Sequence, residues 1–134
     1  MSGVRLTVRV DFGSDRALGP GKIRLLETIG KTGSISRAGR ALGMSYRRAW
    51  LLVADLNRCF RAPVVSTQPG GAQGGGAALT PLGRDLIEKY RAIESRATAA
   101  AERQLHDLEV SLRDQTRRAQ KAVKTSIRAR GTLA

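Results

Sequence analysis

Two adjacent arginines, Arg47 and Arg48, have the residue type and position best suited to specific chemistry in this sequence. A guanidinium group presents a planar fork of N–H donors that fits the two acceptors on the major-groove edge of guanine. Both arginines follow Ser45, a residue type that often caps the N-terminus of a helix. Any surface helix can begin with two arginines, but cations there oppose the helix dipole. We therefore predict that these side chains contact DNA.

The residues around the two arginines predict a pair of short helices. Ser34 and Ser45 are candidate N-caps, and Gly43 lies between them where the chain must turn. Apolar residues recur at helical spacing on both sides of that turn. They are Ile35, Ala38 and Leu42, then Ala49, Val53 and Leu56. Two helices joined by a short glycine turn indicate a helix-turn-helix, and the small residue Gly39 would let them cross closely.

The charge balance favours a polyanionic partner. The chain has 134 residues with 24 Lys and Arg against 11 acids, a formal net charge of +13. Residues 1–80 hold 12 basic and 4 acidic residues, residues 81–110 hold 5 and 6, and residues 111–134 hold 7 and 1. The excess therefore falls on the predicted helix-turn-helix and on the C-terminal tail.

Several function classes find no support in the sequence. It has no metal-ligand spacing, no paired carboxylates in a plausible cleft and no nucleophile beside a base, so we expect neither an enzyme nor a cofactor. No run of ~18 apolar residues could span a bilayer, and we expect no membrane partner. The single cysteine, Cys59, permits no internal disulfide and is expected to be a small buried hydrophobe in a cytoplasmic protein.

The N-terminal part predicts a strand and a scaffold helix. Apolar residues alternate with polar ones from Val4 to Phe12, which is typical of a half-buried strand. A helix is predicted from Lys22, with Gly30 and Gly33 at its end.

A hairpin is predicted after the helix-turn-helix. Residues 64–67 and 77–79 are short apolar runs around a glycine-rich tip, which indicates a wing. The backbone N–H groups of Gly74 and Gly75 could approach a DNA phosphate closely. A nucleotide-binding loop is disfavoured, because such a loop needs a lysine directly after the glycines and the next lysine is Lys89.

A long helix is predicted from Thr80 and Pro81, an N-cap followed by proline at the first helical position. One continuous helix over residues 81–112 would be about 48 Å long. Its apolar stripe exceeds what the winged domain can cover, so we expect the same helix of a second copy to pack on it; the alternative is a helix folded back on its own chain. The predicted dimerisation residues are Leu86, Tyr90, Ile93, Ala97, Ala101, Leu105 and Leu108. His106 is expected at the surface or in this interface.

The order of these elements resembles the N-terminal DNA-binding domain of the molybdate-dependent (ModE) transcriptional regulators and, more distantly, the DNA-binding domain of LysR-type regulators. The resemblance lies in GSIS (residues 33–36), GMSY with the following Ala49-Trp50, and GGAQGGGAALT (residues 70–80) leading into Pro81. It implies a homodimer on a palindromic operator, with Trp50 as a buried anchor. The family's C-terminal molybdate-binding module is not matched, so we expect no small-molecule effector site in this chain.

Together these patterns predict a mainly α winged helix-turn-helix fold with an N-terminal strand. The predicted domains are residues 4–80 for DNA binding, 81–112 for dimerisation and 113–134 as a basic tail, which is either partly helical or frayed. The predicted function is sequence-specific transcriptional regulation on double-stranded DNA; the alternative is a sequence-indifferent architectural DNA-binding protein. The predicted DNA contacts are Ser34, Ser36, Ser45, Tyr46, Arg47, Arg48, Leu51, Gly74 and Gly75.

Overall fold

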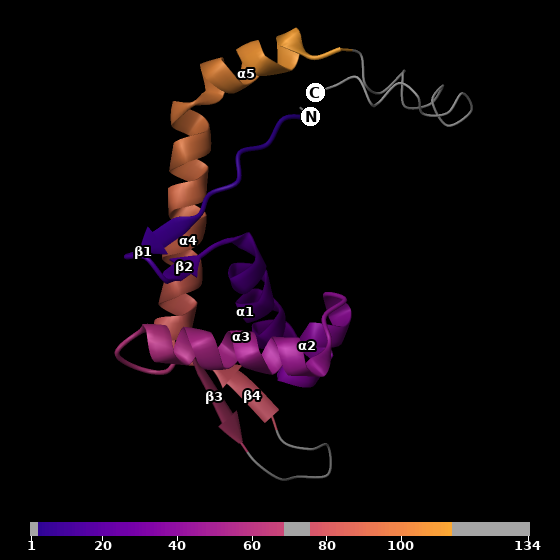
Figure 1. Ribbon diagram of the computed structural model, residues 1–134, viewed down its shortest axis with the longest axis vertical. Helices are drawn as coiled ribbons and strands as arrows, with labels where there is room; N and C mark the ends of the chain where they lie inside the picture. The colour runs from indigo at the N-terminus through magenta and orange to yellow at the C-terminus, as the bar shows by residue number, and fades with distance from the viewer. Residues whose placement is uncertain (1–2, 69–75, 114–134) are drawn as a thin grey trace, which may run out of the picture. The chain divides into compact units, whose positions relative to one another are not determined.

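The structure is a computed structural model that describes residues 3–68 and 76–113 (Figure 1). Its described residues divide into two units, one within residues 6–98 and the other comprising residues 3–5 with 99–113. The predicted phosphate contacts Gly74 and Gly75, and the tail from residue 114 onward, lie outside the described residues.

The described residues are mainly helical, with five helices and two small hairpins. The elements in chain order are β1 (Val10–Phe12), β2 (Arg16–Leu18), α1 (Pro20–Thr32), α2 (Ile35–Ala41), α3 (Tyr46–Cys59), β3 (Val65–Gln68), β4 (Gly76–Leu79), α4 (Pro81–Ala100) and α5 (Glu102–Ser111).

The N-terminal strand is shorter than predicted. Only Val10–Phe12 is a strand, and it pairs antiparallel with the unpredicted Arg16–Leu18. Residues 6–9 lie outside the strand, and the backbone carbonyl of Val8 accepts a hydrogen bond of 2.6 Å from the Tyr90 hydroxyl. Alternating burial from residue 6 to residue 12 therefore reflects packing against the helices as well as the short β ladder.

Helix α1 supplies the centre of the core. Its side chains Ile23, Leu25, Leu26 and Ile29 are fully buried. The prediction that Gly30 helps to end this helix is wrong, because α1 continues to Thr32 and ends at Gly33, whose φ is 71°. Gly30 instead gives room for β4, since an added Cβ would lie 2.9 Å from Cδ1 of Leu79.

Helix α4 begins where the sequence predicts and is anchored at that end. The Thr80 hydroxyl accepts from the N–H of Gly83 at 3.0 Å and donates to the carbonyl of Pro63 at 2.7 Å. Gly83 lies against the backbone of Val64, where an added Cβ would be 2.2 Å from the carbonyl oxygen. Only glycine permits this close approach of the helix to the chain that enters β3.

The prediction of one continuous helix over residues 81–112 is wrong. Helix α4 ends at Ala100, Ala101 has the non-helical backbone angles φ −100° and ψ 10°, and α5 begins at Glu102. The three-to-four-residue spacing of apolar residues is the same on both sides of the break, so the periodicity carries no sign of it.

Helix α4 also buries part of the stripe that we assign to a dimer interface from the sequence. Tyr90 is only 1% exposed, and Leu86 packs against the core of the same chain. Because a side chain this buried has no surface to offer, the assignment of Tyr90 to the dimer interface is wrong. Ile93, one turn further, is 45% exposed.

A bidentate ion pair joins α1 to α4. Arg91 donates from Nε and Nη2 to the two carboxylate oxygens of Glu27, each at 2.9 Å, and from Nη1 to Glu94 at 2.6 Å. The hydrogen bonds from Arg91 lower the pKa of Glu27, and the same bonds raise the pKa of Arg91. Both side chains of the main pair keep substantial contact with solvent, at 40% for Arg91 and 30% for Glu27.

We predict that Glu27→Gln costs about 1 kcal/mol of unfolding free energy at neutral pH, the upper end for partly exposed salt bridges. Because folding lowers this pKa, the pair stabilises the fold above the ordinary carboxyl value of 4.5, and the stability is lost as the pH falls through the lowered value. Urea unfolding at neutral and acidic pH measures both quantities. Asp85→Asn, which breaks an exposed pair with Lys89, is the control and should cost less. If the difference in unfolding free energy between wild type and Glu27→Gln were the same at both pH values, the predicted pH dependence would be contradicted.

Candidate nucleic-acid interface

Helices α2 and α3 form a helix-turn-helix whose predicted caps are confirmed. The Ser34 hydroxyl accepts from the N–H of Arg37 at 3.0 Å, and the Ser45 hydroxyl accepts from the N–H of Arg48 at 3.1 Å. Gly43 adopts the left-handed φ of 73° in the turn between them. Local residue chemistry therefore sets where each helix begins and where the chain turns.

The two helices cross at a point that only a glycine permits. An added Cβ on Gly39 would lie 2.9 Å from the Cβ of Ala49, and the N–H of Met44 donates to the Gly39 carbonyl at 2.8 Å. Ala49, Val53 and Leu56 are fully buried on the inner face of α3. Because this face is held inside, the opposite face of α3 must point outward.

The outward face of α3 carries the two arginines. We call it the arginine face; a shallow groove of about 440 Å³ lies along it. The residues that line the groove are Ser45, Arg47, Arg48, Leu51, Leu52, Asp55 and Arg58. Within the described ranges, neither Arg47 nor Arg48 has a carboxylate within ion-pair distance, whereas Asp55 pairs with Lys22 at 3.1 Å and with Arg58 at 3.4 Å. The guanidinium groups best placed for a ligand are thus those of Arg47 and Arg48.

The other predicted contacts are placed less uniformly. Tyr46 and Leu51 are 61% and 55% exposed on α3, which suits a contact surface. Ser34 and Ser36 are half-buried, and their hydroxyls already accept hydrogen bonds, from the N–H of Arg37 and from Nη2 of Arg40 at 3.4 Å.

Two expectations on burial are wrong. Trp50, expected as a buried anchor, is 37% exposed, and its ring meets the Tyr46 ring edge to face at a centroid distance of 6.2 Å. Helical spacing places Trp50 outside the buried stripe that Ala49, Val53 and Leu56 form on α3. Cys59 is half-buried rather than buried. His106 is exposed on α5, as one of the two expected placements requires.

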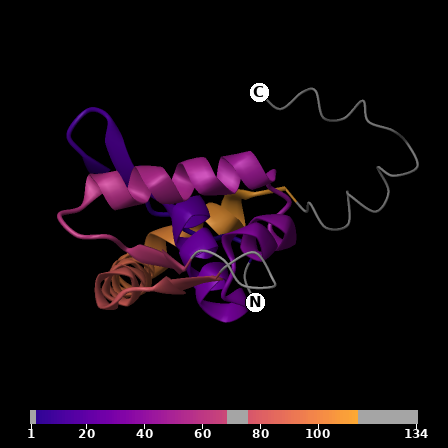
Figure 2. The same ribbon diagram turned by 90° about the horizontal axis from the view of Figure 1, so that it is seen from below.

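Strands β3 and β4, which follow α3, lie side by side next to α4, which Figure 2 shows end-on. Strands β3 and β4 pair antiparallel from Val65 opposite Leu79 to Gln68 opposite Gly76, and we call this hairpin the wing. The N–H of Ala77 donates to the carbonyl of Gly33 at 2.9 Å, which fastens β4 to the turn between α1 and α2.

Asn57 joins the wing to α3 and was missed in the sequence. Its Oδ1 accepts from the N–H groups of Val64 and Val65 at 2.8 and 3.2 Å, and its Nδ2 donates to the carbonyl of Val65 at 3.2 Å. One amide thus satisfies three backbone groups at the start of β3. The only sequence signal is a single amide beside an apolar helix face, which many surface positions share.

Residues 21–84 match the family described as bacterial regulatory helix-turn-helix protein, lysR family. This stretch, which runs from α1 through the wing into α4, is therefore a DNA-binding helix-turn-helix domain of the lysR type. The matched class consists of transcription regulators and not of enzymes.

The relatives of the chain include ModE regulators, whose N-terminal region it matches. It is 38% identical over 105 residues to the molybdenum transport protein ModE of Azotobacter vinelandii, with 77% of this chain and 39% of that protein covered. It is 51% identical over 78 residues to the molybdenum-pterin-binding protein MopB of Rhodobacter capsulatus, with 58% of this chain and 29% of that protein covered. It is 39% identical over 71 residues to the DNA-binding transcriptional dual regulator ModE of Escherichia coli K12, with 53% of this chain and 27% of that protein covered. The chain thus spans less than two fifths of the length of these relatives.

Residues 3–68 and 76–113 hold no group of three His, Cys, Asp or Glu side chains placed to bind a metal ion. No helix in this part of the chain combines the length and the apolar character needed to cross a membrane.

We predict that Asn57→Ala lowers the unfolding free energy by roughly 1–3 kcal/mol, because it leaves partly buried backbone groups without partners. Asn57→Asp keeps the acceptor for the two N–H groups but places an oxygen against the Val65 carbonyl, so it should recover only part of that loss. Chemical denaturation of the two variants and the wild type measures the difference. An Asn57→Ala protein as stable as the wild type would show that the amide does not hold the wing.

Proposed function

We propose that this chain is a sequence-specific DNA-binding transcription regulator that acts as a homodimer on a palindromic operator. The observation that carries the proposal is the exposure of Arg47 and Arg48 in the first turn of α3, opposite its buried face. That turn is where a recognition helix presents side chains to base edges in the major groove.

The arginine face has the chemistry to read DNA sequence. Arg47 and Arg48 can each fork onto the O6 and N7 acceptors of a guanine, and the exposed Leu51 can contact a thymine methyl group. Ser45 and the wing glycines Gly74 and Gly75 would contact phosphates and fix the register of the helix on the duplex. The carboxylate of Asp55, held between Lys22 and Arg58, would disfavour close approach of a phosphate to that end of the helix.

Dimerisation is proposed through the apolar residues that each compact unit leaves exposed. In residues 6–98 these are Ile93, which is 45% exposed, and Ala97, which is half-buried. In residues 99–113 they are Leu108, which is 60% exposed, and the half-buried Ala101 and Leu105. Each set is proposed by itself as a surface for a second copy. A second copy would cover these side chains, and two-fold symmetry would place two α3 helices about 34–36 Å apart, one turn of B-DNA.

We further propose that the regulated genes serve molybdenum metabolism. This rests on the names of the relatives, which include molybdenum transport and molybdenum-pterin-binding proteins. A regulator of this kind acts on the chromosome, so we propose the cytoplasm as its location.

For Arg47→Ala we predict a loss of base preference at one position of each half-site, worth roughly 1–3 kcal/mol, with other positions unchanged. The measurement is selection of bound fragments from random DNA at physiological salt, for variant and wild type in parallel. As a control, replacing Arg117 and Arg118 in the basic tail should weaken binding to all sequences and reduce the salt dependence. An unchanged preference profile for Arg47→Ala would rule out this role of α3.

The same selection experiment distinguishes a sequence-specific regulator from the alternative, an architectural DNA-binding protein. A sequence-indifferent binder would enrich no motif and would be displaced equally by bulk genomic DNA and by the selected fragments. A regulator should keep its selected fragment against a large excess of genomic DNA.

A charge placed in the proposed dimer surface should separate the two copies. We predict that Ile93→Asp raises the Kd of the dimer roughly a hundredfold, about 3 kcal/mol, because the carboxylate would be buried without a partner. Leu51→Asp, which places the same charge at an apolar residue that is 55% exposed on the arginine face, is the control and should leave the dimer intact. Sedimentation over a concentration series distinguishes them; a monomeric wild type at working concentration would refute the dimer.

A further inference from the structure

Helix α3 exposes an aromatic pair that the arginine face does not include. Tyr46 and Trp50 are 61% and 37% exposed, and their rings contact edge to face at 6.2 Å with an interplanar angle of 69°. Neither lies among the residues of the arginine groove. Two adjacent aromatic rings exposed on one helix form a candidate contact surface.

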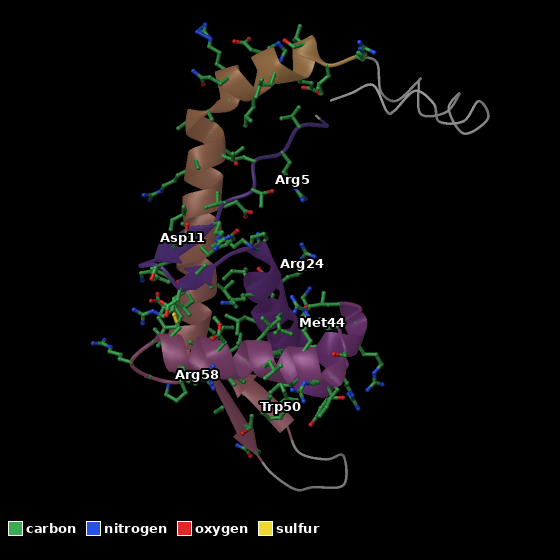
Figure 3. The ribbon with its side chains drawn as sticks, viewed as in Figure 1. Arg5, Asp11, Arg24, Met44, Trp50 and Arg58 are labelled. Carbon is green, nitrogen blue, oxygen red and sulfur yellow. The ribbon has the colours of Figure 1, made fainter. Side chains whose placement is uncertain are left out.

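The pair lies on the flank of α3 that faces the wing. Trp50 and Asn57 are seven residues apart, two helical turns, and so share one side of the helix. Asn57 binds the backbone of Val64 and Val65, where the wing begins. In Figure 3, Trp50 lies below α3, on the same side of that helix as β3 and β4. The pair and the wing therefore border one surface.

We propose that Tyr46 and Trp50 seat the sugar–phosphate backbone of the DNA strand that passes between α3 and the wing. The ring faces would pack on deoxyribose, while the indole N–H and the phenol O–H would donate to phosphate oxygens. This contact rests on the proposed binding of α3 to DNA and adds to it a second, uncharged surface. Contacts to sugar and phosphate position a protein on the duplex without reading its sequence.

The charge around the pair favours DNA as its occupant. Residues 20–61 hold nine Lys or Arg and only two acids, Glu27 and Asp55. Both acids are already held in ion pairs, with Arg91 and with Lys22. A second copy of the chain on this flank would oppose two positive surfaces, whereas a polyanion would neutralise one.

The chain has a single tryptophan, so its fluorescence reports on this surface alone. The full chain is titrated with the duplex that it selects, and Trp50 emission is recorded with and without acrylamide, an uncharged quencher that DNA does not repel. We expect saturating DNA to shift the emission to shorter wavelength and to protect Trp50 from acrylamide. A free tryptophan derivative mixed with the same duplex is the control for quencher effects.

Substitution supplies the second measurement. Trp50→Ala should weaken binding roughly tenfold, equivalent to about 1.4 kcal/mol, for selected and unrelated duplexes alike. Because no cation is removed, the salt slope should stay that of the wild type, unlike the slope of the tail-arginine variant. Trp50→Phe keeps an aromatic face and should lose less affinity, and melting curves establish that both variants are folded.

The outcomes separate this inference from the proposed function. If the wild type binds its duplex but acrylamide still quenches Trp50, or if Trp50→Ala binds with normal affinity, then the proposed backbone contact is wrong and the proposed DNA binding is retained. If the wild type binds no duplex, the proposed contact and the proposed function are both wrong. If Trp50 becomes protected without DNA as protein concentration rises, its occupant is a second copy and the inference is overturned. If Trp50→Ala does not fold, the protection of Trp50 in the wild type and the DNA affinity of Trp50→Phe still test whether these rings contact DNA.

Discussion

The close crossing of α2 over α3 is the contact on which the proposed interface depends. Gly39 and Ala49 meet where any larger side chain would force the helices apart, and this holds one face of α3 in the core. The orientation of every other α3 side chain follows from that contact, because helical geometry leaves the remaining directions to solvent. The arginines are thus presented by packing that occurs on the far side of the helix.

A second set of backbone contacts ties the wing to this frame. The peptide segment at Val64 is held by Asn57 from α3, by Thr80 at the start of α4 and by the bare backbone of Gly83. The ion pair between Glu27 and Arg91 then joins α4 to α1. Helix α3, the wing and α4 therefore form one connected scaffold, which suits a surface that must match the fixed geometry of a duplex.

Features set by local chemistry could be predicted from the sequence, and features set by distant partners could not. The caps at Ser34, Ser45 and Thr80 and the left-handed turn at Gly43 follow from neighbouring residues, and all four predictions are confirmed. Three features depend on contacts with other parts of the chain. They are the unpredicted strand β2, the exposure of Trp50 and the hydrogen bonds from Asn57 to the start of β3. Periodicity identified the apolar stripe of α4 but could not divide it between the protein's own core, which takes Tyr90, and the exposed Ile93.

The most direct test of the central claim, that the exposed side of α3 meets DNA, is amide chemical-shift mapping of the isotope-labelled chain during titration with its selected duplex. The account predicts that the largest changes fall on residues 45–58 and on the strands of the wing, with α1 little affected. Changes concentrated on α1 or α5, with α3 unperturbed at saturation, would contradict it.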